Sequence, residues 1–241
     1  MPDILLHLLP HVVSSLLYAA LGFHFWHTRW REKERSLVTL PMQPWERAAI
    51  VVALLIQGFG LYQGVFAGGG MRFSFSYALS LMLWLAVLIY WLESFRSRMD
   101  GLQPMVLPLA AAGAAAPAIF PQLRVIGHAG GLGFLVHFLA AMLAYSLFTL
   151  SALHAVFMGF AERKLHQRSM THSLSSLPPI LTMEALLFRM ITVAFCLLTV
   201  ALVSGVWFSE EIFGKAAALD HKTLFAFASW GIFAALLVGR R

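Results

Sequence analysis

Ten histidines occur in this 241-residue chain, in which only 12% of the residues are charged. Imidazole binds metal ions and haem iron, so histidines within apolar sequence are the first candidates for chemistry. His137 lies five residues inside a long apolar run that begins at residue 132. His221 directly precedes the last apolar run. Two imidazoles on separate helices could bind one metal ion or one six-coordinate haem iron, provided that the fold places them at the same depth.

The other histidines invite simpler interpretations. His7 and His11 share one face of the first apolar run, where they form either a metal-binding pair or a polar face turned into the protein. His24 and His154 lie near the ends of runs, so we expect them to reach the membrane interface. The remaining four lie at a run's end or in loops and are expected to be solvated: His27, His128, His166 and His172.

Seven apolar runs must position these side chains. The chain is 60% hydrophobic with a mean hydropathy of +0.78, which no soluble domain of this size could bury. A span needs about 20 residues to cross roughly 30 Å of hydrocarbon, and the runs have about this length. The sequence therefore predicts one integral membrane domain over residues 1–241, an all-α bundle of about seven transmembrane helices. The predicted spans are 4–26, 48–66, 73–91, 102–120, 132–165, 186–208 and 223–238.

Basic residues give these spans a direction. If the loops alternate sides, thirteen of the seventeen Lys and Arg residues fall on one side and four on the other. The positive side is cytoplasmic, so the N-terminus is predicted outside and the C-terminus inside. The same pattern excludes a nucleic-acid surface, because the charges lie in short segments between apolar runs. In this topology His137 and His221 both lie at the outer ends of their spans.

Three other functions remain open from the residues alone. A wire of two haems needs same-face histidines about 14 residues apart, and His137 and His154 are 17 apart, which disfavours it. A structural or regulatory subunit without a cofactor would need no histidine pair. A small transporter could use Gln57, Gln63 and Glu93, the well-placed polar residues of the second and third spans. The single cysteine, Cys196, cannot form an internal disulfide.

Two segments resemble a known family. The spacing of His137, Ala141, Ala144 and Tyr145, followed by Glu-Arg-Lys-Leu at 162–165, is similar to a span of the cytochrome c assembly family, the haem-handling membrane proteins of the CcsA/CcmC type. The second segment carries residues that match the family's tryptophan-rich outer loop: Trp207, Gly214, Asp220 and Lys222. Phe213 and Leu219 stand where tryptophans are expected and His221 replaces a proline, so the chain looks closer to the YpjD/HemX-like branch.

The resemblance implies a haem at the outer face of a bacterial cytoplasmic (inner) membrane. His137 and His221 would be the axial ligands, with Trp207 beside the macrocycle. It implies a haem-binding protein and not an enzyme, whose partners are lipid, haem and other membrane proteins of cytochrome assembly. Members of the family usually continue into an eighth span, so the chain is either a short variant or a truncated sequence.

Overall fold

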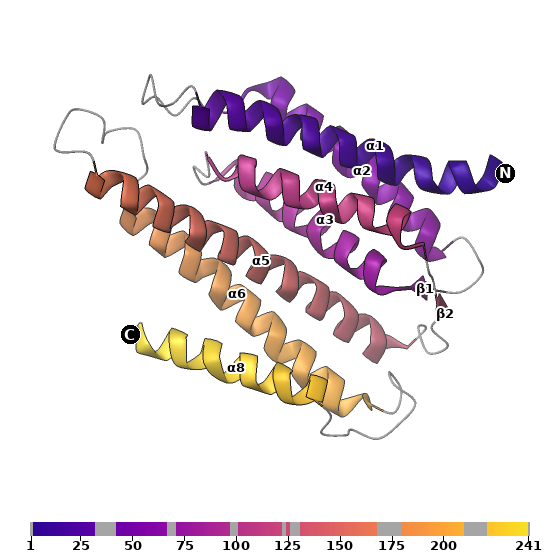
Figure 1. Cartoon of the computed structure of the whole chain (residues 1–241). Coiled ribbons are helices and arrows are strands. Elements are labelled where there is room, and N and C mark those ends of the chain that lie inside the picture. Colours follow the sequence, from indigo (N-terminus) through magenta and orange to yellow (C-terminus); the bar gives the residue numbers. More distant parts are fainter. Residues whose placement is uncertain are drawn as a thin grey trace.

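The computed structural model describes residues 2–31, 42–66, 71–96, 101–121, 124–125, 131–167, 180–209 and 221–240, which fold almost entirely as helices. In these residues the seven α-helices are α1 (Pro2–Phe25), α2 (Pro44–Phe66), α3 (Phe75–Glu93), α4 (Gln103–Ile119), α5 (Leu132–Gln167), α6 (Ile180–Trp207) and α8 (His221–Gly239). Consecutive helices run in opposite directions, so the two termini lie at opposite ends of the bundle (Figure 1).

The helices confirm the predicted class of a polytopic all-α membrane protein. Helices satisfy their backbone hydrogen bonds internally, as hydrocarbon requires. Two helical segments, α4 and Thr223–Gly239 of α8, are apolar but shorter than the rest. Five segments are long and apolar enough to cross a membrane: Leu8–Trp30, Pro44–Phe66, Phe75–Glu93, Leu132–Arg163 and Leu181–Trp207. The protein is therefore a multi-pass membrane protein, and its orientation stays a prediction.

Several helices extend beyond the predicted spans. The first helix does not end at residue 26, because a π-helix, η1 (Trp26–Arg31), continues it. The fifth does not end at residue 165, because α5 remains helical to Gln167. Residues 161–167 are polar but contain good helix formers. Polar side chains favour water over lipid around this part of the helix, but they do not end the helix. Likewise α6 begins at Ile180, six residues before the predicted start.

A two-stranded ladder joins two loops at one end of the bundle. Strand β1 (Arg72–Phe73) pairs antiparallel with β2 (Arg124–Val125), with Arg72 opposite Val125. The ladder lies between the α2–α3 and α4–α5 connections (Figure 1). Two-residue strands carry no readable alternation, so the sequence could not predict it.

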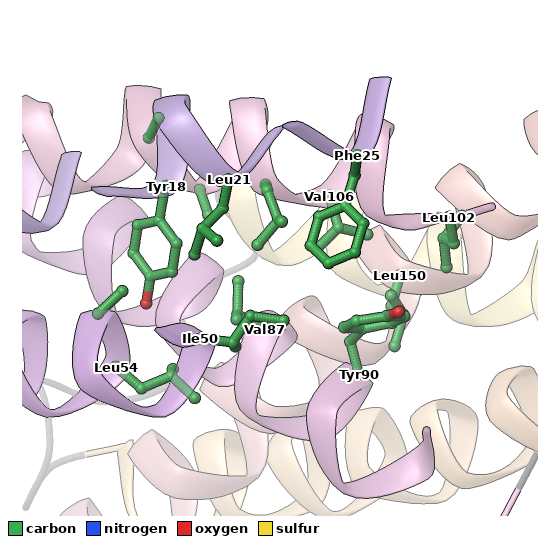
Figure 2. Packing of buried hydrophobic residues seen from close by; sticks show 14 of the residues in the cluster. Tyr18, Leu21, Phe25, Ile50, Leu54, Val87, Tyr90, Leu102, Val106 and Leu150 are labelled. Carbon is green, nitrogen blue, oxygen red and sulfur yellow. The ribbon is translucent and has the colours of Figure 1, made fainter. Parts of the chain in front are cut away.

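Residues of α1 to α4 form most of the main hydrophobic core, and residues of α5 and α6 complete it (Figure 2). Small residues let α4 approach its neighbours closely, as is common between membrane helices. A Cβ built on Gly113 would lie 2.4 Å from Leu83 Cδ1 on α3. On the opposite side, Ser15 Oγ of α1 donates a hydrogen bond to the Ala111 carbonyl (2.8 Å). The alanine-rich composition of the fourth run thus serves close packing.

Helices α5, α6 and α8 form the other part of the bundle. Ser146 Oγ of α5 donates to the Met82 carbonyl of α3 (2.8 Å), which ties the two parts together. Helix α8 packs on α6, where Trp230 Nε1 donates to Thr199 Oγ1 (2.9 Å). Helices α5 and α8 run in the same direction (Figure 1), so their N-terminal ends lie at the same end of the bundle.

Candidate functional site

His137 is held against α6 by its Nδ1 atom. The ring is half-buried, and Nδ1 lies 2.9 Å from the carbonyl oxygen of Ala201. Ser204 Oγ lies 3.4 Å from the same nitrogen and donates to the same carbonyl at 3.1 Å. Gly205 provides the space, because a Cβ at this position would lie 3.0 Å from His137 Cε1. The imidazole therefore occupies a notch in α6 that a larger residue would fill.

The bond to Ala201 determines which ring nitrogen can act as a ligand. A carbonyl oxygen only accepts hydrogen bonds, so Nδ1 of His137 must carry the proton and donate. In the neutral ring the lone pair is then on Nε2. Histidines that bind metals commonly donate the other ring N–H to a carbonyl, which fixes the tautomer and raises the basicity of the ligand nitrogen. His137 thus has the fixed ring and the Nε2 lone pair that are expected of an axial ligand.

Phenylalanines gather around this end of α5. Phe134 and Phe138 stack with ring centroids 5.7 Å apart, and Phe73 of β1 meets Phe138 edge-on at 5.1 Å. Phe208 covers Gly133, one turn before His137, where a Cβ would lie 2.6 Å from Phe208 Cγ. Phe208 therefore covers the contact between α5 and α6, the α5–α6 seam, at this end, whereas Phe134 and Phe138 lie on the side of α5 that meets β1. Aromatic rings near His137 suit a flat apolar ligand.

His221, the second predicted ligand, begins α8 and is exposed. Two contacts define its depth. Phe148 stacks on Phe233 with centroids 4.0 Å apart. His137 lies eleven residues before Phe148 and His221 twelve before Phe233. At about 1.5 Å per residue these separations are about 17 Å and about 18 Å, so the two histidines lie at nearly the same level.

The contact of α8 with α6 gives a larger offset. Trp230 meets Thr199, two residues from the Ala201 that binds His137. His221 lies nine residues before Trp230, whereas Ala201, at the level of His137, lies only two residues beyond Thr199. By this count His221 lies about 10 Å further toward the end of the bundle than His137. The ligands of a six-coordinate iron lie on opposite faces of the haem, so the two Cα atoms need not touch. The structure thus places both histidines at one end of the bundle, within about two helical turns of each other along its axis.

Trp207, the third predicted residue, ends α6 at the same end and is 80% exposed. Its indole lies outside the α5–α6 seam in this structure. Several residues of the predicted site lie outside the described residues: Phe213, Gly214, Lys215, Leu219 and Asp220. The side chains of Arg124 and Lys222, two further cations of this end, are also outside the described part.

Of two other buried histidines, His154 differs from the sequence prediction and His11 agrees with one of its alternatives. His154 is 2% exposed, and its Nε2–H donates to the Met183 carbonyl of α6 (3.1 Å), so it does not extend to the interface. His11 is buried and meets Tyr77 edge-on with centroids 5.6 Å apart, which agrees with a polar face turned into the bundle. Among the described residues there is no group of three His, Cys, Asp or Glu side chains that could hold a metal ion.

The sequence prediction missed an ionic cluster where α1 meets α2. The Glu46 carboxylate is buried and accepts hydrogen bonds from three groups. These are Arg29 Nη2 (2.9 Å), His24 Nε2 (3.0 Å) and the Gln43 backbone N–H (2.7 Å). A glutamate three residues after the residue that precedes a helix is a known signal for the start of that helix. Nothing in the sequence identified the partners of Glu46 on α1. His24 is thus part of an ion-pair cluster rather than a solitary interfacial residue.

Two of the three polar residues considered for a transporter, Gln57 and Glu93, are engaged in contacts between helices. Gln57 Nε2 donates to Ser80 Oγ (3.0 Å) and to the Ser80 carbonyl (3.2 Å). Glu93 forms an ion pair with Arg189 of α6. These contacts join α3 to α2 and to α6, so both side chains have structural roles.

Comparison with known proteins identifies the family. The Cytochrome C assembly protein family matches residues 45–241, which is most of the chain and includes both candidate ligands. The chain belongs to the cytochrome c assembly protein family. Inner membrane protein YpjD of Escherichia coli K12 is 22% identical over 200 residues, covering 81% of this chain and 75% of that protein. The YpjD proteins of E. coli O6:H1 and O157:H7 match equally well. No solved structure matches.

The family match includes the motif around His137, whose parts have distinct surroundings. Ala144 is completely buried, whereas Tyr145 is exposed. His137 faces α6, as its bond to Ala201 shows. The small residues of this cytochrome c assembly motif thus bury one side of α5, and its histidine is fixed against a neighbouring helix.

Proposed function

We propose that this member of the cytochrome c assembly family binds haem at the outer face of the bacterial cytoplasmic (inner) membrane. His137 and His221 are the axial ligands, and the end of the α5–α6 seam receives the macrocycle. The protein holds haem during cytochrome assembly and does not transform a substrate. Its partners are the lipid bilayer and other membrane proteins of cytochrome assembly.

The single observation that carries this proposal is the hydrogen bond from His137 Nδ1 to Ala201. This hydrogen bond selects the tautomer of His137 with a lone pair on Nε2, and it fixes the ring before haem binds. The family match and the placement of His137 and His221 at one end of the bundle support the same assignment. The Phe134–Phe138 stack and Phe208 offer apolar side chains near the imidazole of His137. The residues present therefore fit a haem.

When bound, haem would supply an iron whose reduction potential depends on its axial ligands. The chain itself supplies the remaining elements. The Ala201 carbonyl orients the imidazole of His137, and the aromatic residues limit access of water to the seam. His221 is exposed, so it can meet a haem that enters from the outer side.

The test is an absorption spectrum of the protein purified in detergent from cells supplied with haem. Wild type should show the Soret and α/β bands of a low-spin haem with two nitrogen ligands. His137→Ala should lose most of the haem, because this ligand is the better oriented of the two. His221→Ala should retain haem with a high-spin spectrum, and His27→Ala, at the opposite end of the bundle, should match wild type.

A colourless wild type would overturn the proposal and favour a subunit without a cofactor. If the wild type is coloured and its spectrum is unchanged in both ligand variants, the protein binds haem, but His137 and His221 are not its ligands. The two failures are distinct, because the first concerns the cofactor and the second concerns its site.

A further inference from the structure

Two buried polar atoms lie within the first four helices, away from His137. Tyr18 of α1 and Gln57 of α2 are both 0% exposed. Among the described residues, Tyr18 Oη and Gln57 Oε1 have no hydrogen-bond partner in the protein. The amide nitrogen of Gln57 is already bound to Ser80, so this side chain cannot simply turn to pair its oxygen. Buried polar groups nearly always have a partner, and in the membrane interior bulk water cannot provide one.

The packing of α1 on α2 brings the two side chains toward each other. Gly60 lies against His11, since a Cβ there would be 3.2 Å from His11 Cε1, and further along Glu46 binds His24. In this antiparallel register Tyr18 lies about four residues, or about 6 Å along the axis, from the level of Gln57.

Side chains on a helix lean toward its N-terminus, and the two helices run in opposite directions. The polar ends of Tyr18 and Gln57 therefore converge. Figure 2 shows the Tyr18 hydroxyl directed from α1 toward the part of α2 that carries Leu54, one turn before Gln57. Ser14 lies on α1 at the level of Gln57 and is also completely buried. Its hydroxyl donates to the His11 carbonyl (3.2 Å), which leaves its oxygen able to accept.

We propose that an ordered water molecule occupies a site between α1 and α2 and bridges Tyr18 to Gln57. The water accepts a hydrogen bond from Tyr18 Oη and donates to Gln57 Oε1. Its second hydrogen is directed at Ser14 Oγ. Buried waters typically make about three hydrogen bonds, and this set supplies three.

The chemistry of the site favours water over a cation. The three side chains are neutral, and the Tyr18 hydroxyl must donate a hydrogen bond to the occupant. A bound cation cannot accept a hydrogen bond, and dehydrated cations require several oxygen ligands, usually with a carboxylate among them. The site is independent of the proposed haem site, which lies on α5, α6 and α8.

Two measurements on the full-length protein test this site. In X-ray radiolytic labelling, hydroxyl radicals form from bound water and modify the side chains beside it. Tyr18 should be labelled, whereas Phe25, an equally buried aromatic residue of the same helix, should not. In thermal unfolding, Tyr18→Phe should lower the melting temperature, because the water loses a donor.

The sign of the stability change separates the alternatives. If the site is dry, removal of an unpaired hydroxyl relieves a desolvation cost and Tyr18→Phe raises the melting temperature or leaves it unchanged. Tyr62→Phe, on a side chain that is 66% exposed on α2, is the matched control for loss of a hydroxyl. The proposal is overturned if Tyr18 stays unlabelled, or if Tyr18→Phe is no more destabilising than Tyr62→Phe.

Discussion

Gly205 provides the space for the imidazole of His137, the first of the two proposed ligands. A Cβ at Gly205 would lie 3.0 Å from His137 Cε1 and 3.2 Å from Nδ1, which is closer than nearly all Cβ contacts. A branched side chain would therefore force the imidazole out of the notch and away from the Ala201 carbonyl. Overpacking of this kind costs about 1–3 kcal/mol.

Gly205→Val should weaken haem binding about tenfold or more, since each 1.4 kcal/mol is a factor of ten in affinity. Haem titration monitored by absorbance measures the change. Gly231→Val is the matched control, because a Cβ at Gly231 of α8 has no atom within 4 Å. Equal affinities for the two variants would show that the notch does not position the ligand.

The buried carboxylate of Glu46 should contribute strongly to stability. Removal of one member of a buried ion pair leaves an uncompensated charge and typically costs about 3–5 kcal/mol. Glu46→Ala should therefore lower the thermal stability of the detergent-purified protein markedly. Glu93→Ala breaks the more exposed pair with Arg189, for which about 0–1 kcal/mol is expected.

A second variant tests the cause of this difference. The double variant Arg29→Met, Glu46→Leu replaces the pair by apolar side chains and should recover most of the lost stability, because neither charge is then left buried alone. If Glu46→Ala and Glu93→Ala shift the melting temperature equally, burial does not determine the strength of these pairs.

At the scale of the elements, the depth of His221 depends on how α8 lies along α5. The two helices run in the same direction (Figure 1), and the stack of Phe148 on Phe233 places a contact between them. Cysteines at these two positions should form a cross-link with a short bifunctional reagent, in a Cys196→Ala background that removes the native thiol. The paired change Phe148→Cys, Val238→Cys is the control, because Val238 lies at the far end of α8.

Gel mobility after reduction and without reduction detects the cross-link. A cross-link in the first pair alone supports a shared level for His137 and His221. A cross-link only in the control pair would place α8 in another register and would overturn the level of His221 deduced from the Phe148–Phe233 stack.

Most of the elements could be predicted from the sequence, because a membrane span is defined by composition and length. All seven predicted spans are present as helices, and α4 begins and ends within one residue of its predicted range. The exceptions arise from interactions between elements. The polar end of α5 stays helical through local propensity, and β1 requires a partner 50 residues away in the sequence.

The candidate site could likewise be predicted only in part, because its contacts arise between helices. The spacing of motifs indicated His137 and His221, and topology indicated one end of the bundle for both. The notch at Gly205 and the bond to Ala201 depend on the register of α5 and α6, which no single helix encodes. The partners of His24 and His154 are likewise on other helices, so both were interpreted as interfacial residues from position alone.

At the scale of the whole molecule, the distribution of charge predicts the orientation on which the function depends. In the predicted topology, thirteen Lys and Arg residues fall on the side opposite to His137 and His221, and four fall on the histidine side. The positive-inside rule then places the two histidines on the outer side. A haem site on that side could serve assembly outside the cytoplasm, whereas the opposite orientation would reverse this role.

Cysteine labelling in intact cells determines the orientation directly. In the Cys196→Ala background, Trp207→Cys should react with a thiol reagent that cannot cross the membrane, because this position is exposed at the histidine end. Arg96→Cys, exposed at the other end, should react only after the membrane is permeabilised. The reverse pattern would put His137 and His221 on the cytoplasmic side. Haem binding could then persist, but a haem donor facing outward could not, so this measurement decides which compartment the site serves.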